Sequence, residues 1–193
     1  MNPGNTDEFL TLVNHDNKLT SDHVPQDLMA LVDTRKDNRE TQMMRKYAAM
    51  ALEAMFKELR AAGFEDVSVT SAYRSYSYQE YLFNYYTAQG GAEYAAQVSM
   101  PAGSSEHQSG LCADLHNLPS ASKDFANEDA YKWLRENCWK FGFILRYPED
   151  KVEITKISFE PWHYRYVGRY HAQKMHQSNM CLEEYIAFIS SGN

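Results

Sequence analysis

Residues 105–114 read SEHQSGLCAD, and this stretch combines a turn with two side chains of metal-binding type. His107 and Asp114 frame it, and a zinc hydrolase usually takes three protein ligands of these types and leaves a fourth position for water. Gly110 lets the chain turn between the two ligands at little steric cost. Serine, glycine and proline recur over residues 100–112, which is typical of a loop, and residues 113–116 are predicted to leave it as a strand.

A second stretch, Glu160-Pro-Trp-His163, supplies another histidine and a carboxylate three residues before it. Pro161 fixes its own φ and disturbs strand pairing, so Glu160 and His163 need not follow strict strand alternation. Both side chains could then face one cavity. A lone histidine or a lone Glu-x-x-His is a weak signal, but the combination with residues 105–114 is far more specific.

Together with their flanking residues, these stretches resemble the zinc D-alanyl-D-alanine carboxypeptidases, a family that includes vancomycin-resistance D,D-peptidases and L,D-carboxypeptidases. Residues 105–114 resemble the motif S-x-H-x-x-G-x-A-x-D, except that Cys112 stands where the family usually has alanine. Residues 160–168 resemble the E-x-W-H motif and its tail, and residues 71–79 resemble the substrate-binding Y-R-S…Q segment. The resemblance covers about residues 10–189.

The resemblance implies a zinc metallopeptidase that hydrolyses the C-terminal D-Ala bond of peptidoglycan stem peptides or of D-Ala-D-Ala. It implies that Zn²⁺ is bound by His107, Asp114 and His163. Glu160 would be the general base, and Arg74 would steady the oxyanion. Contact with the end of the peptide is implied for Ser105, Gln79 and Tyr147.

Each assignment has an alternative in the sequence. His116 lies two residues past Asp114, shares its side of a strand, and could compete as a ligand. Arg74 could form a surface ion pair, and Glu160 could be an ordinary exposed carboxylate. Cys112 is predicted to point away from Asp114, as a small buried apolar residue rather than a ligand.

Three further functions compete with the D,D-carboxypeptidase. These are an L,D-carboxypeptidase acting on tetrapeptide stems, an endopeptidase (lysin) cutting between L-Ala and D-Glu, and a non-catalytic module that binds wall peptide. Glu160 argues against the binding module, because such a module needs no base beside the metal. No wall-binding domain is recognisable, which is mild evidence against the lysin.

The composition fits one soluble domain of 193 residues. A net charge of −7 argues against nucleic-acid binding, since phosphates attract the opposite sign. No apolar run approaches the roughly 20 residues of a membrane helix. Residues 1–10 carry no visible export signal, so a cytoplasmic location is expected, or the cell envelope if a leading segment was trimmed. Three widely spaced cysteines mildly favour a reducing compartment.

Periodicity predicts an α+β domain with a central antiparallel sheet flanked by helices. Residues 1–40 are expected to form an arm that packs on a catalytic domain of residues 41–193. Glycines 90 and 91 are expected to interrupt one helical region. The predicted helices span residues 41–62, 77–88, 92–98, 129–141, 169–177 and 182–190. The predicted strands span residues 67–73, 113–116, 143–147, 152–159 and 163–167.

Overall fold

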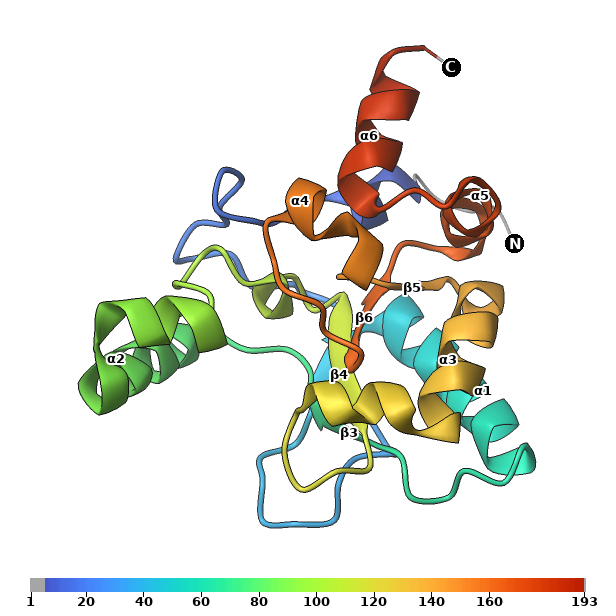
Figure 1. Ribbon diagram of the computed structural model, residues 1–193, viewed down its shortest axis with the longest axis horizontal. Helices are drawn as coiled ribbons and strands as arrows, with labels where there is room; N and C mark the ends of the chain where they lie inside the picture. The colour runs from blue at the N-terminus through green and yellow to red at the C-terminus, as the bar shows by residue number, and fades with distance from the viewer. Residues whose placement is uncertain (1–5, 193) are drawn as a thin grey trace.

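A four-stranded antiparallel sheet forms the centre of the computed structural model, which describes residues 6–192 (Figure 1). Residues 1–5 of the predicted arm and residue 193 lie outside the described residues. The strand order is β3-β4-β6-β5, so each of the two inner strands pairs on both sides. The strands are β3 (Ser68–Ser71), β4 (Cys112–His116), β6 (His163–Tyr166) and β5 (Phe143–Leu145). The predicted α+β class with an antiparallel sheet is confirmed.

Helix α1 (Lys46–Ala61) carries the largest part of the core against this sheet. Its side chains at three- and four-residue spacing form one apolar face, and Leu52, Met55, Phe56 and Leu59 are at most 1% exposed. The helix begins later than predicted, because Met43–Arg45 forms strand β2 and pairs with β1 (Leu28–Ala30). Helical spacing of apolar residues gives no information on strand pairing, so the prediction missed β2.

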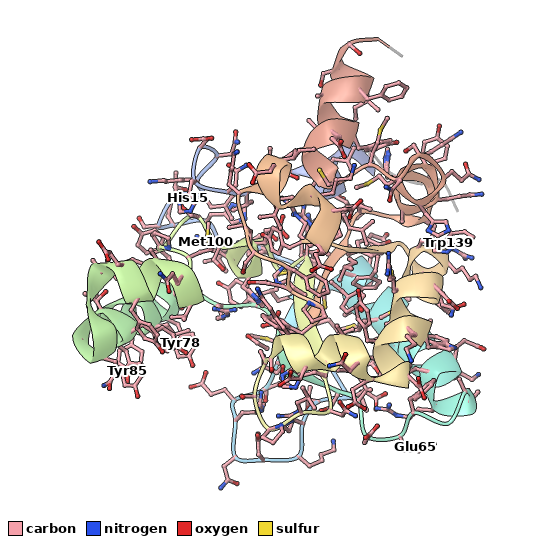
Figure 2. All side chains as sticks on the ribbon, in the orientation of Figure 1. His15, Glu65, Tyr78, Tyr85, Met100 and Trp139 are labelled. Carbon is pink, nitrogen blue, oxygen red and sulfur yellow. The ribbon has the colours of Figure 1, made fainter. Side chains whose placement is uncertain are left out.

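The remaining helices surround the sheet or extend from it (Figure 1). Helix α2 (Tyr76–Val98) projects to one side and contains the predicted break, with Gly91 at φ 84°. Figure 2 shows Tyr78 and Tyr85 together on α2, and these side chains are 48% and 49% exposed. The others are α3 (Asp129–Asn137), α4 (Val152–Thr155), α5 (Arg169–Ser178) and α6 (Leu182–Ser190).

The predicted strand over residues 152–159 is wrong. A 3₁₀ turn (Glu149–Lys151) leads directly into α4, and Lys156 ends that helix at φ 60°. The alternation of Val152 and Ile154 suggested a half-buried strand, but Ile154 is 42% exposed. Residues 152–159 have no partner in the sheet, whose order ends at β5. The backbone hydrogen bonds at the start of this segment are made within the helical turn instead.

The segment before β1 lies against the sheet and its helices. Phe9 packs edge-to-face on Tyr166 with ring centroids 5.2 Å apart, and Leu10 joins a second apolar cluster with Val167 and Leu182. No helix among residues 6–192 is long and apolar enough to cross a membrane.

Candidate metal centre

The register of β4 against β6 brings two predicted ligands together. Asp114 lies directly opposite His163 in the antiparallel pair, although the two are 49 residues apart in the chain. Side chains of directly opposed residues share one face of a sheet. The Nδ1 atom of His163 is therefore 3.0 Å from Oδ1 of Asp114.

His107 reaches the same carboxylate from the short 3₁₀ helix η2 (Glu106–Ser109). Gly110 ends this helix at φ 68°, and a Cβ there would lie 3.1 Å from Leu28 Cδ2 and 3.2 Å from Arg45 Cγ, so both conformation and space favour glycine. Nδ1 of His107 is 2.6 Å from the carbonyl oxygen of Ala72, which can only accept a hydrogen bond. This contact leaves Nε2 as the lone-pair nitrogen, 3.4 Å from Oδ2 of Asp114.

The donor set fits a zinc ion. Zn–N and Zn–O bonds of about 2.0–2.2 Å in a tetrahedron place neighbouring donors about 3.4 Å apart. The two nitrogen–oxygen distances, 3.0 and 3.4 Å, match that spacing. His107, Asp114 and His163 are 3%, 8% and 4% exposed, so these polar groups are held away from bulk water.

The charges at this cluster are strongly coupled. Burial would raise the pKa of Asp114, but the two imidazoles hold it well below its usual range. Burial would lower the pKa of His163, but the charge of Cys112 and the hydrogen bonds to Asp114, Cys112 and Glu106 raise it well above its usual value. A site that pulls protons onto imidazole in this way has a negative potential, which a cation also satisfies.

Glu160 lies beside this cluster, at the turn that precedes β6. Its backbone carbonyl accepts a hydrogen bond from the amide of His163 (3.2 Å), and its Oε2 is 3.7 Å from Nδ1 of the same histidine. Burial raises the pKa of the Glu160 carboxyl. The alternative of an ordinary exposed carboxylate does not fit a side chain that is 26% exposed and faces a predicted ligand.

Arg74 faces the cluster from the segment after β3. Its Nη2 is 3.8 Å from Oδ2 of Asp114, and its side chain is 18% exposed, so it is not a surface ion pair. Gln79 is 1% exposed and accepts a 2.7 Å hydrogen bond from Nη1 of Arg74. The Gln79 amide group also donates to Ser99 and to the carbonyl of Met100 (2.9 and 2.7 Å). Gln79 therefore supports Arg74 in this structure, and its contact with a peptide stays a prediction.

Tyr147 and Ser105, also predicted to contact the peptide, lie close to the ligands. The ring of Tyr147 is tilted against that of His163 with centroids 5.0 Å apart, and burial raises the pKa of its hydroxyl. Ser105 immediately precedes η2 and is 4% exposed. Both residues are therefore placed beside the site, and their contact with a substrate stays a prediction.

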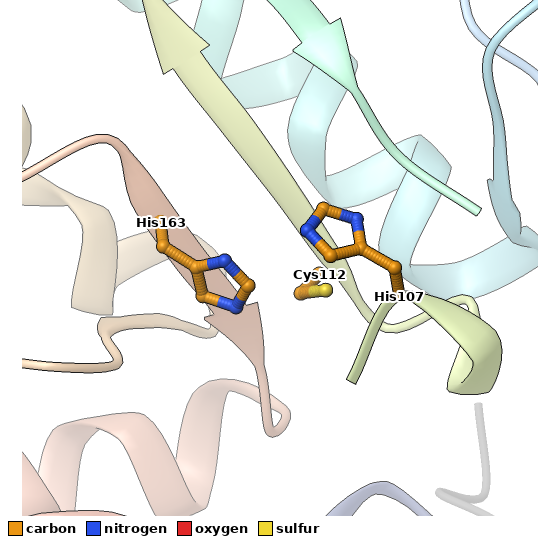
Figure 3. Close-up of side chains that lie close together, drawn as sticks. All are labelled: His107, Cys112 and His163. Carbon is orange, nitrogen blue, oxygen red and sulfur yellow. The ribbon is translucent and has the colours of Figure 1, made fainter. Parts of the chain in front are cut away.

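Cys112 is buried as predicted, but the prediction that it points away from Asp114 is wrong. Residues two apart in a strand share a face, so Cys112 lies on the ligand side of β4. Figure 3 shows it between the rings of His107 and His163, and its sulfur and one nitrogen from each ring lie within 4.8 Å of one another. Burial alone would raise the pKa of the thiol, but the two histidines lower it to about 7.

His116, the alternative ligand, is held by partners outside the cluster. It shares the strand with Asp114, but its Nδ1 lies 3.3 Å from Nη2 of Arg35 and its ring packs edge-to-face on Phe125. It lies opposite Ser68 at the end of β4, two residues beyond Asp114. Because its ring already contacts Arg35 and Phe125, the structure gives no support to His116 as a metal ligand.

Glu106 is the residue that sequence reasoning missed. Its side chain is fully buried and contacts Arg146 (2.8 Å), Arg165 (2.7 Å) and Nε2 of His163 (3.5 Å). Burial would raise the pKa of this carboxyl, but the two guanidinium groups hold it well below its usual range. The available signal was two arginines inside apolar strand patterns, at 146 and 165, which require a buried anion nearby.

Comparison with known proteins identifies relatives over most of the chain. The family described as D-alanyl-D-alanine carboxypeptidase (VanY) matches residues 41–169. The carboxypeptidase-like protein YodJ of Bacillus subtilis (strain 168) is 36% identical over 190 residues, which are 94% of this chain and 68% of that protein.

Two solved structures have the same fold. The LdcB LD-carboxypeptidase superposes with a TM-score of 0.86 at 34% identity, covering 95% of this chain and 88% of that one. A mutant of the vancomycin-resistance D,D-pentapeptidase VanY, in complex with Zn(II), gives 0.75 at 34% identity, covering 93% and 99%. With the family match and the convergent ligands, these likenesses lead to one conclusion: the chain belongs to the D-alanyl-D-alanine carboxypeptidase family.

Proposed function

We propose that this protein is a zinc metallopeptidase that removes the C-terminal D-Ala from peptidoglycan stem peptides. The zinc ligands are His107, Asp114 and His163. One observation carries the proposal: the Asp114 carboxylate lies between two imidazole nitrogens at 3.4 and 3.0 Å, and Glu160 Oε2 lies 3.7 Å from one of them. The arrangement combines nitrogen and oxygen donors that suit zinc with a carboxylate that is not a ligand. Metal-assisted hydrolysis needs such a free carboxylate as its base.

Glu160 acts as the general base. A bound zinc ion supplies Lewis-acid polarisation and lowers the pKa of water from 15.7 to about 7. Glu160 accepts the proton of the attacking water and delivers it to the leaving amine. A general base works best when its pKa approaches the working pH, and burial shifts the Glu160 carboxyl in that direction.

Arg74 stabilises the negative charge that develops on the carbonyl oxygen of the scissile bond. Its Nη2 lies 3.8 Å from Oδ2 of Asp114, and its buried Nε has no hydrogen-bond partner among the described residues, so this guanidinium keeps donor capacity for a substrate. Gln79 fixes the opposite edge of the group at 2.7 Å. Loss of one preorganised donor of this kind typically costs about 3–4 kcal/mol of barrier.

Residues 41–193 form the catalytic part, with residues 1–40 as the arm that packs on it. Ser105 and Tyr147 contact the end of the peptide. The substrate places the protein in the cell envelope if it trims wall-attached stems, and in the cytoplasm if it acts on free peptides. The −7 charge gives no support to nucleic acid as a partner.

A second candidate is an L,D-carboxypeptidase acting on tetrapeptide stems. It is favoured by the likeness to the LdcB LD-carboxypeptidase, whose TM-score of 0.86 exceeds the 0.75 of the VanY structure. Both reactions release D-Ala by the same chemistry and differ in the residue before the broken bond.

The test is a product profile on purified pentapeptide, tetrapeptide and tripeptide stems, read by mass spectrometry. Loss of one D-Ala from the pentapeptide supports the D,D reading, and loss of D-Ala only from the tetrapeptide supports the L,D reading. Cleavage between L-Ala and D-Glu, or no cleavage of any stem by zinc-loaded protein, would overturn both. Glu160→Gln serves as the control: it should retain zinc and lose nearly all turnover, and an active Glu160→Gln protein would remove Glu160 from its role.

A further inference from the structure

The buried carboxylate of Glu106 divides its two oxygens between two kinds of partner. Oε1 accepts hydrogen bonds from Nε of Arg146 (2.8 Å) and Nη1 of Arg165 (2.7 Å). Oε2 faces Nε2 of His163 at 3.5 Å. The Glu106 and arginine side chains are 0% exposed, so water does not replace any of these contacts.

The two arginines hold Glu106 rigidly because each is itself anchored elsewhere. Arg146 makes a two-pronged contact with Glu183 on α6, at 2.9 and 2.6 Å. Arg165 donates to the carbonyl oxygens of Phe9 (3.0 Å) and Thr11 (2.7 Å). Charge-assisted contacts of this length are strong and geometrically specific. Oε2 is therefore fixed in place, although neither arginine contacts it.

Both ring nitrogens of His163 face a carboxylate, so without a metal the ring can carry a proton on each. With a cation bound between Nδ1 and Asp114, the remaining ring proton is on Nε2, and Oε2 of Glu106 accepts from it. That tautomer presents the lone pair of Nδ1, which is the nitrogen 3.0 Å from Asp114. His107 is set in the same way by the Ala72 carbonyl behind its Nδ1. Each imidazole of the site thus has an acceptor on its far side.

We propose that Glu106 is a positioning residue for the metal: through His163 Nε2 it orients the ring and keeps Nδ1 available as a ligand. This inference rests on the proposed zinc function. If Glu106 served only to neutralise the two buried arginines, it would need no contact with His163. Because Oε1 contacts the arginines and Oε2 faces the imidazole, we assign Glu106 the additional role of orienting His163. Loss of such an outer carboxylate typically weakens metal binding about 10- to 100-fold.

The test compares zinc affinity, measured by competition with a chromophoric chelator, in the wild type, Glu106→Gln and Glu183→Gln. Glutamine cannot accept from His163 on one atom and from both arginines on the other, because one of its two atoms is a donor. Glu183→Gln is the matched control, since it removes the other carboxylate on Arg146 and has no contact with His163. Glu106→Gln should bind zinc about 10- to 100-fold more weakly. Glu183→Gln loosens one anchor of Arg146 but leaves Oε1 of Glu106 with both arginines and Oε2 facing His163, so its loss of affinity should be clearly smaller.

Wild-type affinity in Glu106→Gln, or an equal loss in Glu183→Gln, would overturn the positioning role while leaving the proposed function intact. A wild-type protein that binds no zinc would remove the proposed function and this role with it. If Glu106→Gln does not fold, nitrogen NMR of the histidine rings in the zinc-loaded wild type decides. A proton on Nε2 of His163 supports the proposal, and a proton on Nδ1 refutes it.

Discussion

Asp114→Asn and Cys112→Ala form a pair of substitutions that tests which side chain completes the ligand set with the two histidines. Both residues lie on the same face of β4 and both are next to His107 and His163. Asp114 has oxygen atoms 3.4 and 3.0 Å from the two ring nitrogens, which is the donor spacing of a single zinc ion, and the Cys112 sulfur lies within 4.8 Å of a nitrogen of each ring. Asp114→Asn should therefore weaken zinc binding strongly, and Cys112→Ala should not.

The magnitude follows from the number of donors. Protein zinc sites with four ligands bind with about 10–16 kcal/mol, which is about 2.5–4 kcal/mol for each ligand. Since about 1.4 kcal/mol is a factor of ten, losing Asp114 should lower the affinity roughly 100- to 1,000-fold. Cys112→Ala installs the residue that the family motif usually has, and should change the affinity by less than about threefold because no ligand is lost.

The assay is chelator competition on metal-stripped, refolded protein, with circular dichroism confirming the fold of each variant. Cys138→Ala is the matched control, since Cys138 is also buried but lies outside the ligand cluster. Cobalt(II) loading adds a direct reading, because a bound thiolate gives an intense charge-transfer band and carboxylate does not. A hundredfold loss in Cys112→Ala, or a thiolate band in the wild type, would show that cysteine is the third ligand.

Three other substitutions test residues that position the site or stabilise the fold. Gln79→Leu should lower kcat about 10- to 100-fold at unchanged zinc content, since it removes the 2.7 Å bond that fixes Arg74; a kcat within twofold of wild type would contradict this. Gly110→Ala should lower the free energy of unfolding by at least about 1–2 kcal/mol, because φ is 68° and the new Cβ would lie 3.1 Å from Leu28; an unchanged urea midpoint would count against it. Burial raises the pKa of the Cys138 thiol from 9.0 to about 12, so the folded state keeps a proton that the unfolded chain releases. This thiol should therefore lower stability by up to about 1.4 kcal/mol per pH unit as pH rises above 9. Cys138→Ala should make the slope of stability against pH shallower by that contribution in urea titrations, and an identical slope would refute it.

Local patterns predicted most of the elements. The apolar stripe around Leu52 and Phe56 predicted α1, since helical spacing there coincides with burial. The same logic failed where pairing decides the structure. Strands β1 and β2 have three residues each, which is too short for a periodic signal, and Ile154 alternates without a neighbouring strand to pair with.

The sequence predicted the site residues that belong to a recognisable motif. It did not predict those whose position depends on packing between segments far apart in the chain. His107, Asp114, His163 and Glu160 converge as the motif spacing predicted, because β4 and β6 pair in the required register. The position of Glu106 could not be read from its neighbours in the chain, since its partners are 40 to 59 residues away. The side-chain direction of Cys112 was within reach, because the two-residue period of a strand already fixes it.

The contacts of Arg165 also bear on where the independently folding unit starts. The family match begins at residue 41, yet this guanidinium binds backbone oxygens of Phe9 and Thr11 with the same planar group that holds Glu106. An expression fragment trimmed to the matched boundary would leave this fully buried cation short of two acceptors, on the same strand as the predicted ligand His163. Boundaries for recombinant work, and for grafting this domain onto other proteins, belong upstream of residue 9.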